Sequence, residues 1–171
     1  EKAQDHPLWF KEPYGAHEHV PETEEYGIRS FVYRARRPFH PEKFQAFIGR
    51  TWPGLIRAKG HFWLATRPLW VGEFSLAGAI ARVAPMGRWW AAVPRQRWPD
   101  HPEWKRVISR HWDAVWGDRR QELVFIGTGM DEEAIRAALD DCLVGQAGRR
   151  TFDPAAYRAL RDPFPQWEAA A

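Results

Sequence analysis

The sequence predicts an α+β fold, a two-layer sandwich in which helices pack on one face of a mostly antiparallel sheet, with a split βαβ arrangement as one form of it. Three observations predict this class. Local patterns follow one another along the chain as strand, helix, several strands, helix, strand and helix. The length of 171 residues, with 44% hydrophobic and 27% charged residues, suits one globular domain with a real core. Eleven tryptophans add large apolar groups that need such a core or an interface.

The first strand and the first helix follow from composition and spacing. Residues 27–35, GIRSFVYRA, are rich in β-branched and aromatic side chains, which favour a strand. A helix is predicted within residues 36–50, with Pro41 at its first position. The side chains at helical spacing, which are expected to face the core, are Phe44, Phe47 and Ile48.

Residues 55–64 alternate between two kinds of side chain, which is the pattern of a half-buried strand. The set expected to face the core contains Ile56, Ala58, Gly60, Phe62 and Leu64. The set expected to face away from the core contains Arg57, Lys59, His61 and Trp63.

The middle of the chain predicts more strands and then the strongest helix. Residues 69–87 are expected to be extended, with a second piece beyond Gly78, and residues 88–94 to add a short strand. A helix is predicted within residues 100–117, capped by Asp100 or His101. Its apolar stripe contains Trp104, Val107, Ile108, His111, Trp112 and Val115.

The last elements are a strand and a capped helix. Residues 119–129 predict the strand, and Asp131 is expected to cap a helix that ends at Gly145. Its inward side chains are Ile135, Ala138, Leu139, Cys142 and Leu143. The predicted organisation is an interdomain linker over residues 1–25, the α+β domain over 26–145, and a tail over 146–171 that packs on the domain.

Composition and motifs exclude several kinds of chemistry. Because no G-x-x-x-x-G-K-[ST] loop is present, this chain is not expected to bind nucleotide phosphates or to be an enzyme. Residues 127–134 are expected to form a capped turn. The single Cys142 excludes an internal disulfide, is expected to be a buried thiol, and fits the reducing cytoplasm. Neither a membrane span nor a signal peptide is recognised, and the start at Glu1 indicates a fragment or a processed product.

Several polar residues have both a functional and a structural interpretation. His111 lies on an apolar stripe, where a hydrogen-bonded core histidine is favoured over a metal ligand or an acid–base group. His40, like His101, is expected to cap a helix or to lie in a turn. Asp118, Arg119 and Arg120 are expected to form ion pairs at a turn, and an anion site is the alternative.

The outward set of residues 55–64 is the predicted interaction surface, made of Arg57, Lys59, His61 and Trp63. Its KGHFWL segment loosely resembles the RNA-binding strand of an RRM, so stacking of single-stranded nucleic acid is an alternative. His61 and Phe62 depart from that motif, and a surface for another protein domain explains the same residues. Nucleic acid is therefore the less favoured partner.

Residues 16–27, AHEHVPETEEYG, place two histidines among four glutamates. His17 and His19 are candidate zinc ligands, with a carboxylate from Glu22, Glu24 or Glu25 as a third. Two imidazoles fall short of the three or four protein ligands that zinc needs, so a solvated connector is the favoured interpretation.

Four blocks of the sequence together resemble the C-terminal domain of CobW-like GTPases, a family of metal chaperones. The blocks, which span about Glu22 to Trp167, are ETEEYGIRSFVYRARRPFHPEKF, WPGLIRAKGHFWLATRP, GDRRQELVFIG and LRDPFPQW. The resemblance implies that an N-terminal GTPase domain, which binds GTP and Mg²⁺, precedes this one in a cytoplasmic parent protein. It also implies delivery of zinc or cobalt to a metalloprotein client. For this chain it implies a non-catalytic interaction or regulatory domain that holds no GTP, with zinc at His17 and His19 as a minority hypothesis.

Overall fold

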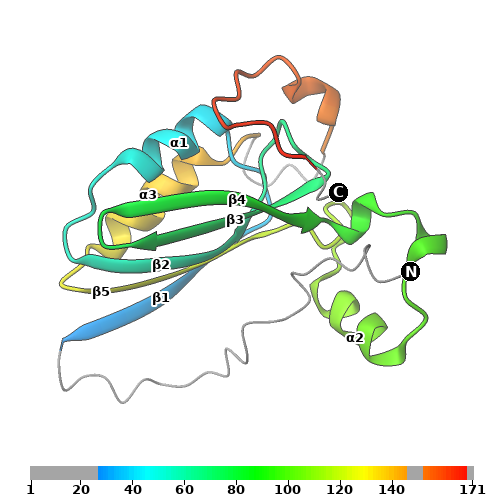
Figure 1. Ribbon diagram of the computed structural model, residues 1–171, viewed down its shortest axis with the longest axis horizontal. Helices are drawn as coiled ribbons and strands as arrows, with labels where there is room; N and C mark the ends of the chain where they lie inside the picture. Colours follow the sequence, from blue (N-terminus) through cyan, green and yellow to red (C-terminus); the bar gives the residue numbers. More distant parts are fainter. Residues whose placement is uncertain (1–26, 146–151, 169–171) are drawn as a thin grey trace.

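One antiparallel sheet organises the molecule, with its strands in the order β1-β5-β2-β3-β4 (Figure 1). The computed structural model describes residues 27–145 and 152–168. The strands are β1 (Ile28–Ala35), β2 (Leu55–Phe62), β3 (Trp70–Ala77), β4 (Ile80–Arg88) and β5 (Gln121–Thr128). The α-helices are α1 (Pro41–Gly49), α2 (Pro102–His111) and α3 (Glu132–Cys142). Short 3₁₀ turns are η3 (Trp90–Ala92), η4 (Arg95–Arg97) and η5 (Pro154–Tyr157).

The predicted fold class is confirmed, and so is its split βαβ form. β1 and β2 both pair antiparallel with β5, so they run parallel to each other with β5 between them. The connection from β1 to β2 contains α1, as a βαβ unit requires. α1 and α3 lie together on one face of the sheet (Figure 1). The opposite face is called the open face below.

The main core lies between the sheet and the α1–α3 layer. Its fully buried side chains include Phe39, Phe44, Phe62, Phe74, Phe125, Leu64, Leu123, Ile135 and Leu139. The aromatic rings pack against one another, with Phe44 as the centre of several contacts such as Phe39 at 4.6 Å and Phe62 at 4.6 Å between ring centroids. Phe164 and Trp167 of the tail pack against this core. The limits of the predicted linker, domain and tail remain predictions.

Local signals gave the two core-covering helices correctly. Pro41 opens α1, and the Asp131 side chain accepts a hydrogen bond from the backbone N–H of Ala134, which caps α3. His40 and His101 occupy N-cap positions without a side-chain cap. The side-chain cap at Asp131 confirms the capped turn predicted within residues 127–134.

Residues 89–118 form a separate tryptophan lobe, which lies beyond one end of the sheet (Figure 1). In its cluster Trp90 and Trp104 meet edge to face, with ring centroids 4.5 Å apart. The strand predicted over residues 88–94 is wrong beyond Arg88, because Trp90–Ala92 is a 3₁₀ turn. The predicted helix ends early as well, at His111.

The side chain of Asp113 explains the early end of α2. Its Oδ1 accepts hydrogen bonds from the backbone N–H groups of Val115 and Trp116, which a continuing helix would need for itself. Trp112 consequently leaves the helical stripe and keeps 37% of its surface exposed.

The alternation predicted for residues 55–64 holds in the middle of β2 and fails at both ends. A bulge between Leu55 and Arg57 turns Ile56 outward, so that 49% of its surface is exposed. At the other end β2 stops at Phe62, and Phe62, Trp63 and Leu64 are all buried.

Candidate functional site

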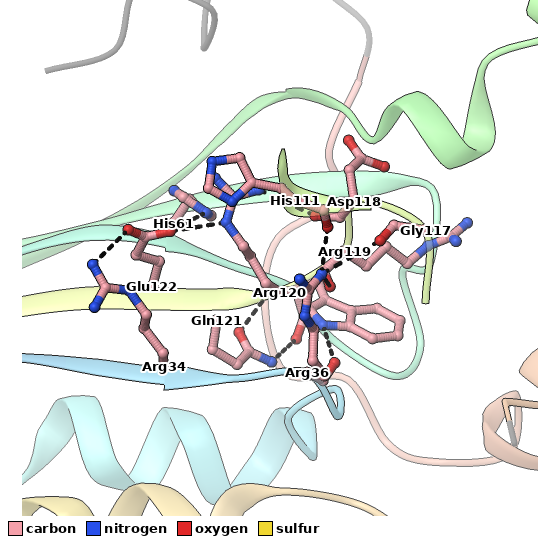
Figure 2. A network of polar contacts seen from close by, with 11 residues as sticks. Arg34, Arg36, His61, His111, Gly117, Asp118, Arg119, Arg120, Gln121 and Glu122 are labelled. Carbon is pink, nitrogen blue, oxygen red and sulfur yellow. Dashed lines mark hydrogen bonds and ion pairs between the residues drawn. The ribbon is translucent and has the colours of Figure 1, made fainter. Parts of the chain in front are cut away.

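A polar network occupies the end of the open face that lies nearest the tryptophan lobe (Figure 2). The strand register places Arg34 opposite Glu122, and Glu122 opposite His61. Arg120 and Asp118 enter from the turn before β5 (Figure 2). The network therefore joins three adjacent strands to the lobe.

Glu122 is the centre of this network. Its carboxylate lies 2.8 Å from Nε of Arg120 and 3.3 Å from Nη2 of Arg34. Burial raises the pKa of Glu122, but the hydrogen bond and charge of Arg120, together with the charge of Arg34, outweigh it and hold the pKa below its usual value. Glu122 is therefore ionised at neutral pH and already paired with two cations. Of the ion pairs predicted for Asp118, Arg119 and Arg120, that of Arg120 is confirmed, with Glu122 of β5 as its partner. Within the described residues, Asp118 and Arg119 bind backbone groups instead.

His61 lies beside Glu122 and under Trp89, whose ring centroid is 5.8 Å away. Its Nε2 is buried without a hydrogen-bond partner in the described part of the chain, and Glu122 Oε2 lies 3.9 Å from it. Burial lowers the pKa of His61 to about 3, and the charge of Arg120 adds to this effect while Glu122 opposes it. The imidazole of His61 is therefore uncharged at neutral pH and cannot offer a positive charge to a binding partner.

The depressed pKa of His61 predicts an acid-sensitive fold. Below about pH 6.5 the unfolded chain takes up a proton at this residue and the folded chain does not, so stability falls with pH. The limiting slope is ~1.4 kcal/mol per pH unit, and an average of about 1 is expected between pH 7.5 and 5.0 because the histidine of the unfolded chain is only partly protonated over much of this range. Urea unfolding at pH 7.5, 6.0 and 5.0 should show this slope, and His61→Gln should flatten it. The exposed His101→Gln is the matched control, and an equally steep slope in His61→Gln would contradict the assignment.

Trp63 was predicted to present an exposed ring, and this is wrong. Its side chain is 0% exposed, its Nε1 donates to the backbone oxygen of Arg36 at 3.0 Å, and the guanidinium of Arg119 lies 5.8 Å from its ring. Gln121, also 0% exposed, accepts from the backbone N–H of Trp63 and donates to its carbonyl. These bonds draw the chain inward directly after β2.

The carboxylate of Asp118 binds backbone groups of the tryptophan lobe rather than a ligand. It is 0% exposed, and its carboxylate accepts from the backbone N–H groups of Trp90 and Ala91, both at 2.9 Å. Nη1 of Arg36 donates to the carbonyl of His111 at 2.7 Å, at the C-terminal end of α2. The charges around this turn are therefore bound to backbone groups, which supports the structural interpretation over an anion site.

Two further candidate residues, Cys142 and His111, lie on helices. Cys142 is 2% exposed, its thiol donates to the carbonyl of Ala138 at 3.2 Å, and burial raises its pKa to about 12. The prediction of a buried thiol is confirmed. His111 lies at the last position of α2 and is half-buried, above Arg120 in Figure 2.

Sequence reasoning missed a C-terminal clamp made of Thr66, Arg67 and Asp162. Arg67 and Asp162 form two hydrogen bonds, at 2.7 and 2.9 Å, and Thr66 donates to the same carboxylate. Arg67 also donates to the carbonyls of Phe164 and Pro165, and its guanidinium lies 4.5 Å from the ring of Trp167. The sequence did contain a sign of this clamp, because its two halves lie within the conspicuous blocks WPGLIRAKGHFWLATRP and LRDPFPQW.

Metal-ligand side chains do not gather within residues 27–145 and 152–168, where no group of three or more His, Cys, Asp and Glu is placed to hold an ion. His17 and His19 lie outside the described residues, so their zinc site remains a prediction. No α-helix in the described ranges combines the length and the apolar character needed to cross a membrane.

Residues 28–143 match the family described as the cobalamin synthesis protein cobW C-terminal domain. The chain therefore belongs to this family, as the resemblance of its four blocks indicated. A relative is the "Zinc-regulated GTPase metalloprotein activator 1" of Dictyostelium discoideum, 41% identical over 150 residues, which are 85% of this chain and 31% of the relative. A zinc chaperone of Mycobacterium tuberculosis is 31% identical over 136 residues, covering 79% of this chain and 34% of the relative. The chain thus spans about a third of the length of these relatives.

A solved structure with some likeness is the Zn(II)-bound YjiA GTPase from E. coli. It shares 19% identity with this chain, covers 69% of this chain and 30% of its own, and superposes with a TM-score of 0.48. At these values the likeness carries no argument about function.

Proposed function

We propose that the chain is the non-catalytic C-terminal interaction or regulatory domain of a GTP-dependent, cytoplasmic metal chaperone. In this proposal GTP and Mg²⁺ bind an N-terminal GTPase domain of the same protein, and the whole protein delivers zinc or cobalt to a metalloprotein client. The observation that carries the proposal is the 41% identity over 150 residues with a relative named as a zinc-regulated GTPase metalloprotein activator.

The geometry supports an interaction role rather than a chemical one. Glu122 is committed to Arg120, and Asp118 is committed to backbone groups of the tryptophan lobe, so neither carboxylate is free for a reaction. Nε2 of His61 is buried beside them without a hydrogen-bond partner in the described part of the chain. Arg57 and Lys59 are exposed on the open face, which supports the proposal that they contribute to an interaction surface. The nucleic-acid alternative loses support, because the ring of Trp63 is buried.

The proposal predicts that residues 1–171 alone neither bind nor hydrolyse GTP, since they contain no phosphate-binding loop. Titration calorimetry with GTP and Mg²⁺ should give no saturable heat at micromolar concentrations. In the longer protein, deletion of residues 28–168 should leave GTP binding intact and change zinc-dependent turnover or client binding. Saturable GTP binding by the isolated chain, or loss of all GTP binding upon that deletion, would contradict the assignment of GTP binding to the N-terminal domain.

A further inference from the structure

Three rows of side chains cross the open face of the sheet, as the strand register defines them. In the order β1, β5, β2, β3, β4 they are Ser30, Ile126, Arg57, Ala77, Ile80, then Val32, Val124, Lys59, Ser75, Arg82, then Arg34, Glu122, His61, Glu73, Ala84. The third row belongs to the polar network described above. The first two rows combine aliphatic side chains with cations, and they lie at the end of the sheet where β1 begins.

The cations of these two rows are not neutralised equally. Lys59 forms an ion pair with Glu73 at 3.2 Å. Arg57 and Arg82 are exposed, and neither has an ion-pair partner in the described part of the chain. Between and beside them, Ile126 is 36% and Ile80 is 63% exposed. This half of the open face is therefore an apolar surface that carries two unpaired arginines, which suits an acidic peptide with some apolar character.

Other occupants fit less well. A second copy docked face to face would bring like charges together, which opposes self-association. Single-stranded nucleic acid needs exposed rings for stacking, and the three rows above offer none, because His61 is covered by Trp89.

A complementary segment lies in this chain, directly before β1. Residues 18–25, EHVPETEE, are called the acidic segment here, since they hold four glutamates. They lie outside the described residues and are attached to β1 through Tyr26 and Gly27. Gly27, with φ of +67°, forms a turn at that point, a conformation that suits glycine and allows the chain to reverse direction before Ile28.

The reach of the acidic segment matches the positions of the two arginines. Neighbouring strands lie about 4.8 Å apart, so Arg57 lies roughly 10 Å and Arg82 roughly 19 Å from β1 across the sheet. Eight extended residues span up to about 26 Å. The segment can therefore pass both arginines while it stays attached to β1.

We propose that the acidic segment binds across the open face of the sheet, with its glutamates next to Arg57 and Arg82. Attachment to β1 gives the segment an effective concentration in the millimolar range, so weak contacts suffice. A protein partner that uses this face must displace the segment, which makes the segment an internal competitor for the interaction surface. The inference rests on this chain alone and is independent of the proposed function.

A spin label on the acidic segment tests the proposal in the full chain. Thr23→Cys carries a nitroxide and keeps all four glutamates, while Cys142, 2% exposed, is protected from the label. The reporter is the methyl signal of Ile80, on the strand farthest from β1, and Ile48 in α1 on the other face is the reference. We expect the methyl signal of Ile80 to lose about half of its intensity or more, because the acidic segment is bound most of the time in this proposal. Ile48 should change much less.

Charge reversal distinguishes binding from mere proximity. Arg57→Glu with Arg82→Glu should restore the Ile80 signal, whereas Arg97→Glu with Arg158→Glu, an equal charge change at exposed sites elsewhere, should not. Equal broadening in both double variants, or no broadening of Ile80 beyond that of Ile48, would overturn the proposal. Broadening that arises only between labelled and unlabelled molecules in a mixture would assign the face to a second copy and overturn it as well.

Discussion

Replacing Trp63 by alanine is expected to lower the free energy of unfolding by about 3–5 kcal/mol, the usual cost of emptying the site of a large buried aromatic ring. The side chain is 0% exposed and packs edge to face against Trp116 and Phe152, with ring centroids 5.9 and 5.0 Å away. The substitution also removes the hydrogen bond to the Arg36 carbonyl. Urea unfolding followed by far-UV circular dichroism measures the loss.

Trp112→Ala is the matched control for this experiment. Trp112 keeps 37% of its surface exposed, so its loss should cost much less. The pair also distinguishes the two interpretations of the KGHFWL segment. A Trp63→Ala variant of unchanged stability that had lost a tight, sequence-selective RNA complex would restore the nucleic-acid hypothesis.

Elements with a local signal could be predicted from the sequence. Pro41 and Asp131 mark helix starts through the geometry of the first turn, and the order of strands and helices follows from side-chain periodicity. The split βαβ arrangement followed from that order, since β1 and β2 flank β5. The helix starts and the order of elements depend on residues that are close together in the chain.

The errors arise where distant residues decide the local structure. The turn at Trp90–Ala92 is capped by Asp118, 28 positions away, so a window around the WWAAVP segment contains no sign of it. The inward position of Trp63 depends on Gln121, 58 positions away. Alternation beyond Phe62 predicted an exposed ring because it assumed that the strand continued. The outward position of Arg57 and Lys59 was therefore predictable from the alternation, whereas the burial of Trp63 was not.

The C-terminal clamp is the strongest case of a long-range contact, because Arg67 and Asp162 are separated by 95 positions. Their side chains are only 12% and 17% exposed. Removing one partner leaves a largely buried charge without its counterion, at a cost of about 3–5 kcal/mol for a fully buried pair. The remaining exposure reduces this estimate, and we expect Arg67→Ala to lower the free energy of unfolding by about 2–4 kcal/mol.

The same substitution should release the tail as well as destabilise the core. Arg67 holds the carbonyls of Phe164 and Pro165 and contacts Trp167, so its loss frees the segment that these residues form. Trypsin should then cleave faster after Arg161, which precedes the clamp, because proteolysis follows the opening of the local structure. Lys43→Ala is the control, since the ion pair of Lys43 with Asp141 is exposed and is worth at most about 1 kcal/mol.

The effect of Arg67→Ala should depend on pH in a defined direction. Burial raises the pKa of Asp162, but the hydrogen bonds from Arg67, Thr66 and the Phe164 backbone outweigh it and hold the pKa below its usual value. The ionised carboxylate therefore stabilises the fold above about pH 4, and this contribution is lost as the pH falls and the group is protonated. The difference in unfolding free energy between the wild-type chain and Arg67→Ala should be constant near neutral pH and should shrink below about pH 4. A difference that stayed constant down to pH 2.5 would show that Arg67 stabilises the fold through packing on Trp167 and its carbonyl contacts rather than through the charge of Asp162.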